Sequence, residues 1–177
     1  MAPERMDNPR ETSHAIVRLE TPLGPLRAMF NVSGLASLCF HMPSEEIHEV
    51  GENAHVTTLK TQVERYFSRR PVEFTIPLAP DGTPFQKNVW KELVKIPFGS
   101  TLTYRQLASA LGGESKTRAV ASAIARNPIL ILIPCHRIIG ADGTLTGYSG
   151  GLERKKALLE YEGSRQADIL LQKSIFD

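Results

Sequence analysis

The chain has 177 residues, of which 41% are hydrophobic and 23% are charged, a composition typical of folded globular proteins. It contains no apolar run of the roughly 20 residues that a membrane helix needs, and residues 1–13 are polar, which excludes a secretory signal and predicts a disordered leader. The net charge is +2, but residues 1–83 hold 8 Lys and Arg against 11 Asp and Glu, whereas residues 84–177 hold 13 against 8; the basic half is compatible with a phosphate-backbone partner or with an ordinary solvated surface.

Three short segments rich in Val, Leu, Ile and Phe predict β-strands in the first half of the chain. They are Ala15–Glu20, Leu26–Asn31 and Leu35–Phe40. The helical spacing of Leu59, Val63 and Phe67 predicts an amphipathic helix over Val56–Arg69, and Val72–Leu78 could form one more strand. Residues 42–54 predict a loop or a weak helix. Residues 14–79 therefore predict a small α/β domain, a three-stranded antiparallel sheet plus a helix, in which no chemistry is evident.

Residues 80–83 form a Pro- and Gly-containing linker, after which the periodicity becomes helical. Thr83 as N-cap and Pro84 in the first turn predict a helix that ends before Pro97. Its predicted apolar face is made of Phe85, Val89, Leu93 and Val94, with Trp90 beside it.

Two further short helices follow, and the turn between them contains two glycines. Thr103 is the predicted cap of a helix over Tyr104–Leu111, and Ser115 is the predicted cap of a helix over Lys116–Arg126. This arrangement predicts a helix-turn-helix, although two ordinary core helices would give the same spacing. Arg118 and Arg126 frame small side chains, which would let this helix approach a neighbouring helix or a nucleic-acid groove.

The rest of the chain predicts one more helix and the segment that carries the chemistry. Ile129–Ile133 is an apolar run too short for a helix, and we expect it to be buried and extended. The last helix, Glu153–Glu162, stops at Gly163. Residues 164–177 form a tail that is compatible with packing on the body or with a short helix.

Cys135 is the candidate nucleophile. A thiol reacts as thiolate and has a pKa of about 8.5 when free, so a nearby base or positive charge would raise its reactivity. His136 is the candidate base, and a carboxylate would orient it. Because adjacent residues of an extended chain point in opposite directions, direct contact between them needs a turn or a bridging water. For this pair alone, a buried Cys beside an unrelated His remains the alternative.

The other candidate groups favour no second site. Ser149 lies in a G-x-S-x-G sequence, but no His follows it, so a serine-hydrolase triad is excluded. Cys39 is expected to pack in the core. Two cysteines without metal-finger spacing indicate a reduced, intracellular protein and predict neither a disulfide nor a zinc site. Four other histidines show no ligand spacing: His14, His41, His48 and His55.

The segment Ile133-Pro134-Cys135-His136-Arg137-Ile138-Ile139-Gly140 resembles the active-site signature of the O6-alkylguanine-DNA alkyltransferases. The resemblance covers residues 83–163 closely, and Thr21–Leu26 resembles the opening hairpin of the bacterial-type members. Further matches at family-like spacing are Thr83-Pro84-Phe85-Gln86 through Trp90, Tyr104, Arg118-Ala119-Val120, Asn127-Pro128, Gly147 to Gly151 and Glu162-Gly163. The coincidence of so many motifs makes the resemblance highly specific.

The resemblance implies a role for each matched residue. Cys135 would accept the alkyl group, His136 would act through a water as its base, and Glu162 would hold the imidazole. Tyr104 would donate a proton or hydrogen bond to the purine, and Asn127 would brace the turn that carries Cys135. The pocket for a flipped guanine would be lined by the backbone of Ile138 with Tyr148 and Ser149. Arg118 would fill the gap left by the flipped base, and the DNA-facing helix would present Ala119, Ser122, Ala123 and Arg126. Arg137 would be structural.

The resemblance implies a partner as well as an activity. A member of the family would bind alkylated double-stranded DNA in the minor groove, without a cofactor, as a monomer in the cytoplasm and nucleoid, or in the nucleus of a eukaryote. Its reaction would be a single stoichiometric transfer of the alkyl group from O6-alkylguanine to Cys135, with O4-alkylthymine left open as a second substrate. The alternatives are a lesion-binding or regulatory helix-turn-helix protein without chemistry, and a cysteine hydrolase, which would turn over.

Overall fold

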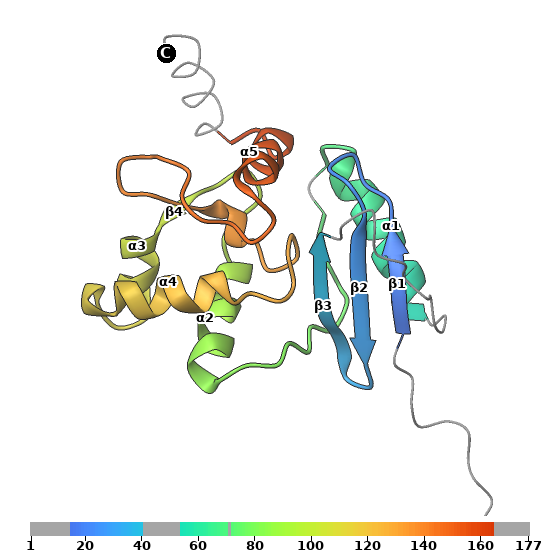
Figure 1. Ribbon diagram of the computed structural model, residues 1–177, viewed down its shortest axis with the longest axis horizontal. Coiled ribbons are helices and arrows are strands. Elements are labelled where there is room, and N and C mark those ends of the chain that lie inside the picture. The colour runs from blue at the N-terminus through green and yellow to red at the C-terminus, as the bar shows by residue number, and fades with distance from the viewer. Residues whose placement is uncertain (1–14, 41–53, 71, 165–177) are drawn as a thin grey trace, which may run out of the picture.

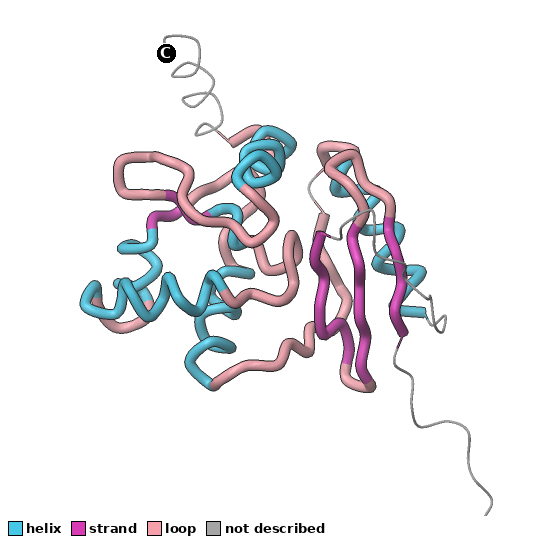
Figure 2. Tube along the Cα trace, in the orientation of Figure 1, coloured by secondary structure: helices cyan, strands magenta, loops and turns pink. Residues whose placement is uncertain are grey.

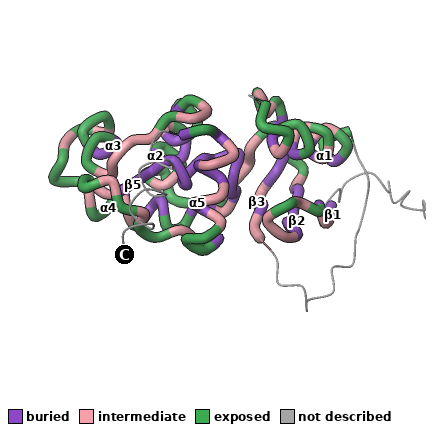
Figure 3. The backbone as a smooth tube through the Cα atoms, turned by 90° about the horizontal axis from the view of Figure 1, so that it is seen from above, coloured by how far each residue is buried: buried purple, intermediate pink, exposed green. Residues whose placement is uncertain are grey.

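The computed structural model describes residues 15–40, 54–70 and 72–164. Figure 1 shows a three-stranded sheet and helix α1 at one side of the molecule and a mostly helical part at the other, and Figure 3 shows the same separation from above. This is the predicted class of fold. The predicted leader, the tail from residue 165 and all of the predicted loop of residues 42–54 except Ala54 lie outside the described residues; Ala54 begins a helix.

The sheet is antiparallel in the order β1-β2-β3, with strands at Ala15–Leu19, Leu26–Asn31 and Gly34–Phe40. Alternate residues of β1 and β2 are buried, as the alternation of apolar residues predicts. Helix α1 spans Ala54–Phe67 and buries a stripe at helical spacing that consists of Val56, Leu59, Val63 and Tyr66. Tyr66 thus takes the buried position that the sequence pattern assigned to its neighbour Phe67.

The free edge of strand β3 pairs with the segment that leads out of the sheet and with the helical part of the molecule. The backbone of Leu35 is bonded to that of Pro77 and Ala79, and the backbone of Leu38 is bonded to that of Pro128 and Leu130, at N–O distances of 2.7–2.8 Å. These short backbone contacts cover a strand edge that would otherwise expose unpaired groups.

Two expectations about extended segments are wrong. Val72–Leu78 is no strand, since only Leu78 forms a single bridge, to Leu35. Ile129–Ile133 is buried as expected, but after a bridge at Ile129 it folds into turns, with Ile131 at a φ of 70°. Burial of an apolar run does not require extension when local bonds such as Ile133 N to Ile129 O satisfy its backbone.

Helix α2 spans Pro84–Val94 and begins with a capping box in which the Thr83 side chain accepts from the amide of Gln86. Its buried residues are Val89, Trp90 and Leu93, whereas Phe85 and Val94 are 36% and 47% exposed. The buried face of α2 therefore differs from the predicted one. Trp90 lies at its centre and not beside it, because the indole Nε1 donates to the carbonyl of Ala123 at 2.9 Å.

The remaining helices are α3 at Tyr104–Ala110, α4 at Thr117–Ala125 and α5 at Leu152–Tyr161. Thr103 caps α3 with a second capping box, as predicted. The predicted cap of α4 is wrong, because Ser115 lies inside a 3-10 turn, Glu114–Lys116, that precedes the helix. α3, this turn and α4 form the predicted helix-turn-helix.

Between α4 and α5 the chain is mostly loop, which Figure 2 shows in pink. It contains a 3-10 turn, Cys135–Arg137, and a two-residue strand β5, Ile138–Ile139, that pairs in parallel with β4, Leu102–Thr103. The sequence pattern did not predict this small sheet. None of the described helices is long and apolar enough to cross a membrane.

Gly34 offers a test of the backbone pairing between β3 and the segment around Pro77. Its φ is +142°, and a Cβ at this position would overlap the carbonyl group of Pro77, which accepts the Leu35 amide. We expect Gly34→Ala to lower the free energy of unfolding by roughly 2 kcal/mol or more, measured by urea denaturation. Gly147→Ala is the matched control, since that glycine faces open space; equal losses in the two variants would contradict this account.

Candidate active site

The carboxylate of Glu162, which directly follows α5, is buried and accepts five hydrogen bonds. Its Oε1 accepts from Tyr66 Oη at 2.7 Å, His136 Nε2 at 2.7 Å and Arg137 Nη2 at 2.9 Å. Its Oε2 accepts from Arg137 Nε at 2.8 Å and from the amide of Gly99 at 3.2 Å. The arginine thus grips the carboxylate with two parallel bonds, the geometry in which this pair is strongest.

The surroundings fix the protonation of both Glu162 and His136. Burial alone would raise the pKa of Glu162, but the hydrogen bond from His136 and those from Arg137 outweigh it and hold that pKa well below its usual range. An ionised carboxylate can only accept, so Nε2 of His136 carries its hydrogen and Nδ1 carries the lone pair. Burial lowers the pKa of His136, against the opposing effect of Glu162, so the imidazole is neutral at pH 7.

Cys135 opens the 3-10 turn and is 3% exposed. Asn127 Nδ2 donates to Cys135 Sγ at 3.0 Å and to the carbonyl of Ile133 at 2.8 Å, and its Oδ1 accepts from the amide of Ile129 at 3.0 Å. Burial raises the pKa of Cys135 to about 11, although the Asn127 hydrogen bond acts in the opposite direction. At neutral pH the sulfur is therefore a thiol that needs a base, and not a standing thiolate.

Cys135 and His136 both lie in the 3-10 turn, and both are buried. Nδ1 of His136 is buried, and within the described part of the chain it has no hydrogen-bond partner. The rings of His136 and Tyr148 meet edge to face, with centroids 6.4 Å apart, and the hydroxyl of Tyr148 is the other buried polar atom without a partner there. The unpartnered Nδ1 belongs to the residue that follows Cys135, and a lone pair of this kind can act as a general base.

A cavity of about 540 Å³ opens beside the sulfur, within the range of small-molecule sites. Its walls come from α3, α4 and the loop that precedes α5: Tyr104, Ala121, Ile124, Ala125, Cys135, Gly140, Thr146, Gly147, Tyr148 and Ser149. Tyr104, Tyr148 and Ser149 thus lie where the sequence predicted a pocket. Tyr104 Oη accepts from Thr146 Oγ1 at 3.3 Å, and burial raises the pKa of Tyr148, which keeps its phenol protonated.

Ile138 is not among the residues that line this cavity. Its amide donates to the carbonyl of Cys135, and its own carbonyl accepts from Lys155 Nζ at 2.5 Å. Lys155 Nζ also donates to the carbonyl of Thr146 at 2.6 Å, so one buried ammonium ties the cysteine turn to the cavity loop. Burial lowers the pKa of Lys155 to about 8.

Sequence reasoning missed Lys155, Tyr66 and Gly99. A signal for Lys155 exists, since it precedes Leu158 by three positions on the same helix face. Tyr66 follows Val63 at the same spacing on α1. Arg137, by contrast, has the predicted structural role, and its Nη1 also donates to the carbonyl of Ile96 at 2.5 Å.

The predicted DNA-facing residues of α4 divide between its faces. Arg118, Ala119, Ser122 and Arg126 are exposed, and Arg126 Nη1 donates to Ser122 Oγ at 3.0 Å. Ala123 does not belong with them: it is 2% exposed, and its carbonyl accepts from Trp90 of α2. Its place on the face opposite to the exposed residues removes it from any DNA surface.

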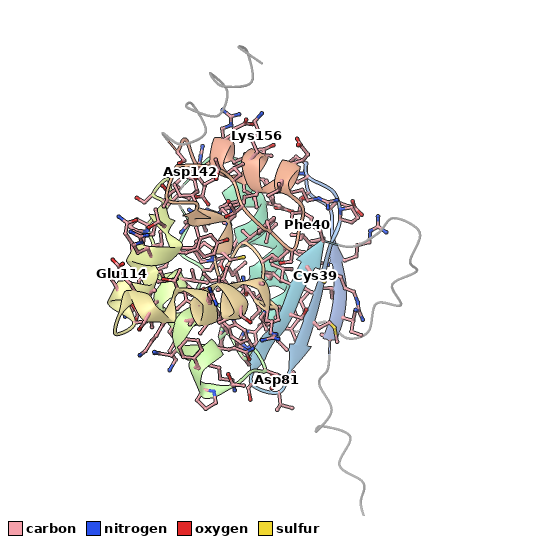
Figure 4. All side chains as sticks on the ribbon, turned by 60° about the vertical axis from the view of Figure 1, so that its left-hand side comes forward. Cys39, Phe40, Asp81, Glu114, Asp142 and Lys156 are labelled. Carbon is pink, nitrogen blue, oxygen red and sulfur yellow. The ribbon has the colours of Figure 1, made fainter. Side chains whose placement is uncertain are left out.

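Cys39 lies apart from the cavity, on the sheet. Cys39 is half-buried on β3 and not packed in the core as expected, and Figure 4 shows it on the sheet with Phe40. Within residues 15–40, 54–70 and 72–164, no three His, Cys, Asp or Glu side chains are grouped so that they could hold a metal ion.

Comparison with known proteins gives a consistent result along the chain. Residues 84–164 match the family model described as the DNA-binding domain of 6-O-methylguanine DNA methyltransferase, and residues 18–80 match its ribonuclease-like domain. A methylated-DNA–protein-cysteine methyltransferase of Methanosarcina barkeri is 43% identical over 148 residues, covering 81% of this chain and 94% of that protein.

Solved structures agree with the sequence matches. The crystal structure of the Mycobacterium tuberculosis O6-methylguanine methyltransferase aligns with a TM-score of 0.76 at 39% identity, over 86% of this chain and 94% of that one. The protein from the same organism in complex with DNA aligns with a TM-score of 0.74 at 38% identity, over 84% and 94% of the two chains.

The buried carboxylate leads to a prediction about stability. Glu162→Gln leaves the guanidinium of Arg137 buried without its counter-charge, and we expect the free energy of unfolding at pH 7 to fall by roughly 3 kcal/mol. Because the folded-state pKa of Glu162 lies below the unfolded value of about 4.3, its contribution is complete above that pH and is lost as the pH falls further.

Chemical denaturation of both proteins across pH 7 to 3 provides the measurement. The difference between wild type and variant should narrow below about pH 4. Glu160→Gln, two residues earlier on α5, is the control and should change stability little. A difference that stays constant with pH, or an equal effect at Glu160, would show that the carboxylate charge is not what stabilises this region.

Proposed function

The chain belongs to the 6-O-methylguanine DNA methyltransferases, which repair DNA by transferring the methyl group to a cysteine, and from this we propose that Cys135 is the acceptor. One observation carries the proposal: of the two cysteines, Cys135 lies in the wall of the cavity, whereas Cys39 lies on β3 of the sheet. Asn127, which donates to Cys135 Sγ, would brace the sulfur. His136 would act as the base, and Glu162 would hold its imidazole.

The substrate base reaches the cavity only after it has left the duplex. The O6 substituent of a stacked guanine cannot approach a sulfur that is 3% exposed, so the nucleotide must flip out at a cost of a few kcal/mol. The aromatic side chains of Tyr104 and Tyr148 in the cavity walls suit a planar purine. The same cavity would admit other flipped bases of similar shape, including an O4-alkylthymine.

Proton removal and attack are coupled in the proposed reaction. With a pKa of about 11, a free thiolate of Cys135 at pH 7 would cost on the order of 5 kcal/mol. His136 avoids this cost when its Nδ1 takes the thiol proton, directly or through a water, as the sulfur attacks the methyl carbon. The S–C bond forms while the C–O6 bond breaks, and the imidazolium is stabilised by the ionised Glu162.

The leaving purine also needs stabilisation, because it departs with a negative charge. The Tyr104 hydroxyl, which faces the cavity from the start of α3, is the proposed donor to that charge. The product at Cys135 is a thioether, which is chemically stable, so one transfer consumes one protein molecule. This stoichiometry separates the reaction from a cysteine hydrolase and from a binding protein without chemistry.

The proposed DNA-binding surface is the exposed face of α4. Arg118, Ala119, Ser122 and Arg126 face solvent, while Ala121 and Ala125 of the same helix line the cavity, so a duplex on this face lies next to the cavity mouth. Small side chains permit the close approach that a minor groove requires, and Arg118 would occupy the gap in the base stack. We propose that the protein binds DNA as a monomer, in the compartment that contains the DNA. Residues 84–163 form the proposed DNA-binding and catalytic unit.

The acceptor assignment is tested by peptide mass mapping after incubation with a duplex that carries O6-methylguanine. We expect one methyl group per molecule, on the peptide that contains Cys135, and no transfer in Cys135→Ala. Cys39→Ala is the matched control and should transfer normally. A methyl group on the Cys39 peptide would contradict the assignment, and binding without any covalent product would support the non-catalytic alternative.

The role of Arg118 is tested by comparing two substrates. Arg118→Ala should slow repair of a duplex lesion roughly tenfold or more, because the flipped state loses its filling side chain, and should affect the free base O6-methylguanine less. Arg70→Ala removes the same charge from an exposed position after α1 and is the control. Equal losses on duplex and free base would contradict a role in flipping.

A further inference from the structure

Tyr66 brings the N-terminal part of the molecule into contact with the catalytic carboxylate. It lies near the end of α1, is 1% exposed, and donates from its hydroxyl to Glu162 Oε1 at 2.7 Å across 96 positions of sequence. Aromatic rings surround it: Phe67 and Phe98 meet it edge to face with centroids 5.2 and 5.9 Å away, and Phe74 lies at 6.2 Å. The hydroxyl is therefore held in one place.

The oxygen that Tyr66 contacts is the one that holds the catalytic imidazole. Glu162 Oε1 accepts from Tyr66 and from His136 Nε2, both at 2.7 Å. Burial and the neighbouring carboxylate raise the pKa of Tyr66, so its hydroxyl stays protonated and remains a donor at every pH in which the protein works. A donor on this oxygen spreads the carboxylate charge and reduces the share available to an imidazolium.

We propose that Tyr66 is a positioning residue for the methyl transfer, whose hydroxyl sets the direction and strength of the Glu162–His136 hydrogen bond and thereby the base strength of His136. The proposal rests on the function proposed above for Cys135 and His136. It makes the N-terminal part of the chain a contributor to the proton relay, through one oxygen atom.

The other ionisable groups around this pair allow the effect to be read from pH dependence. The groups that face His136 or Glu162 are Tyr66, Cys135, Arg137, Tyr148 and Lys155. Lys155 has its pKa at about 8 and Cys135 at about 11, and burial keeps both phenols protonated. Arginine stays charged throughout. His136, whose pKa burial lowers, is therefore the group whose protonation the acid side of the profile reports.

The test compares the pH profile of the transfer rate constant in wild type, Tyr66→Phe and Tyr161→Phe. Without the Tyr66 hydroxyl, Oε1 is more negative, the imidazolium is better stabilised, and the pKa of His136 rises. The neutral base then forms only at higher pH, so the acid limb of the profile should move up by roughly half a unit to one unit, with the plateau changed less. Tyr161 packs on Phe67 in the same aromatic cluster, so its variant is the control and should keep the wild-type limb.

A merely structural role would lower the rate by the same factor at every pH and leave the limb in place. That outcome, an unchanged profile, or the same shift in Tyr161→Phe would overturn the proposal. NMR titration of the His136 ring nitrogens in folded wild type and Tyr66→Phe measures the pKa without any reaction. We expect the same upward shift of the His136 pKa in this titration. The two proposals fail separately. Absence of a methyl group on Cys135 of the wild type, seen by peptide mapping, would refute the proposed acceptor, whereas an unshifted His136 pKa would refute the role of Tyr66.

Discussion

The carboxylate of Glu162 is buried where four segments of the chain meet, and each segment supplies a donor or an acceptor to the contact. Tyr66 comes from α1, Gly99 from the loop after α2, His136 and Arg137 from the turn that starts at Cys135, and Glu162 itself from the end of α5. Burying a lone carboxylate would cost several kcal/mol, and the guanidinium with three further donors offsets that cost. The position of the cysteine turn depends on this carboxylate, because His136 and Arg137 of the turn both donate to it.

The same network explains how a buried site can hold the proposed nucleophile and its proposed base without ionising either one. Burial favours the neutral forms, and Cys135 and His136 are both neutral at pH 7 because the pKa of the thiol is raised and that of the imidazole is lowered. In the proposed reaction, charge appears only when the thiol proton moves to Nδ1, and Glu162, which stabilises the resulting imidazolium, is already ionised and oriented. Preorganised groups of this kind need no reorganisation when the reaction occurs.

The roles of the site residues came from the resemblance of their motifs to a known family. Local rules of sequence predicted the three strands of the sheet and the two threonine caps, because alternation and capping depend on neighbours in the chain. They failed where tertiary contacts decide. Trp90 takes the centre of α2 because its indole finds a carbonyl on α4, and Ala123 is buried by that same bond. The contact between Tyr66 and Glu162 joins residues 96 positions apart and leaves no periodic trace. The burial of Lys155 was missed although its position on α5 is periodic, because a lysine on a helix face is usually solvated.

The N-terminal part carries no chemistry that its sequence reveals, yet it supports the active site from two directions. Tyr66 reaches the carboxylate from inside, while on the outer side Arg154 donates to the carbonyls of Leu23 and Gly150 at 2.9 and 3.1 Å and lies over the ring of Phe40, 4.5 Å from its centroid. Gly150 belongs to the loop that lines the cavity, so the opening hairpin and β3 hold that loop through a single side chain. Helix α1 thus supports the proposed base, and the sheet supports the loop of the cavity, because the segments between α4 and α5 contain too little regular structure to fix themselves.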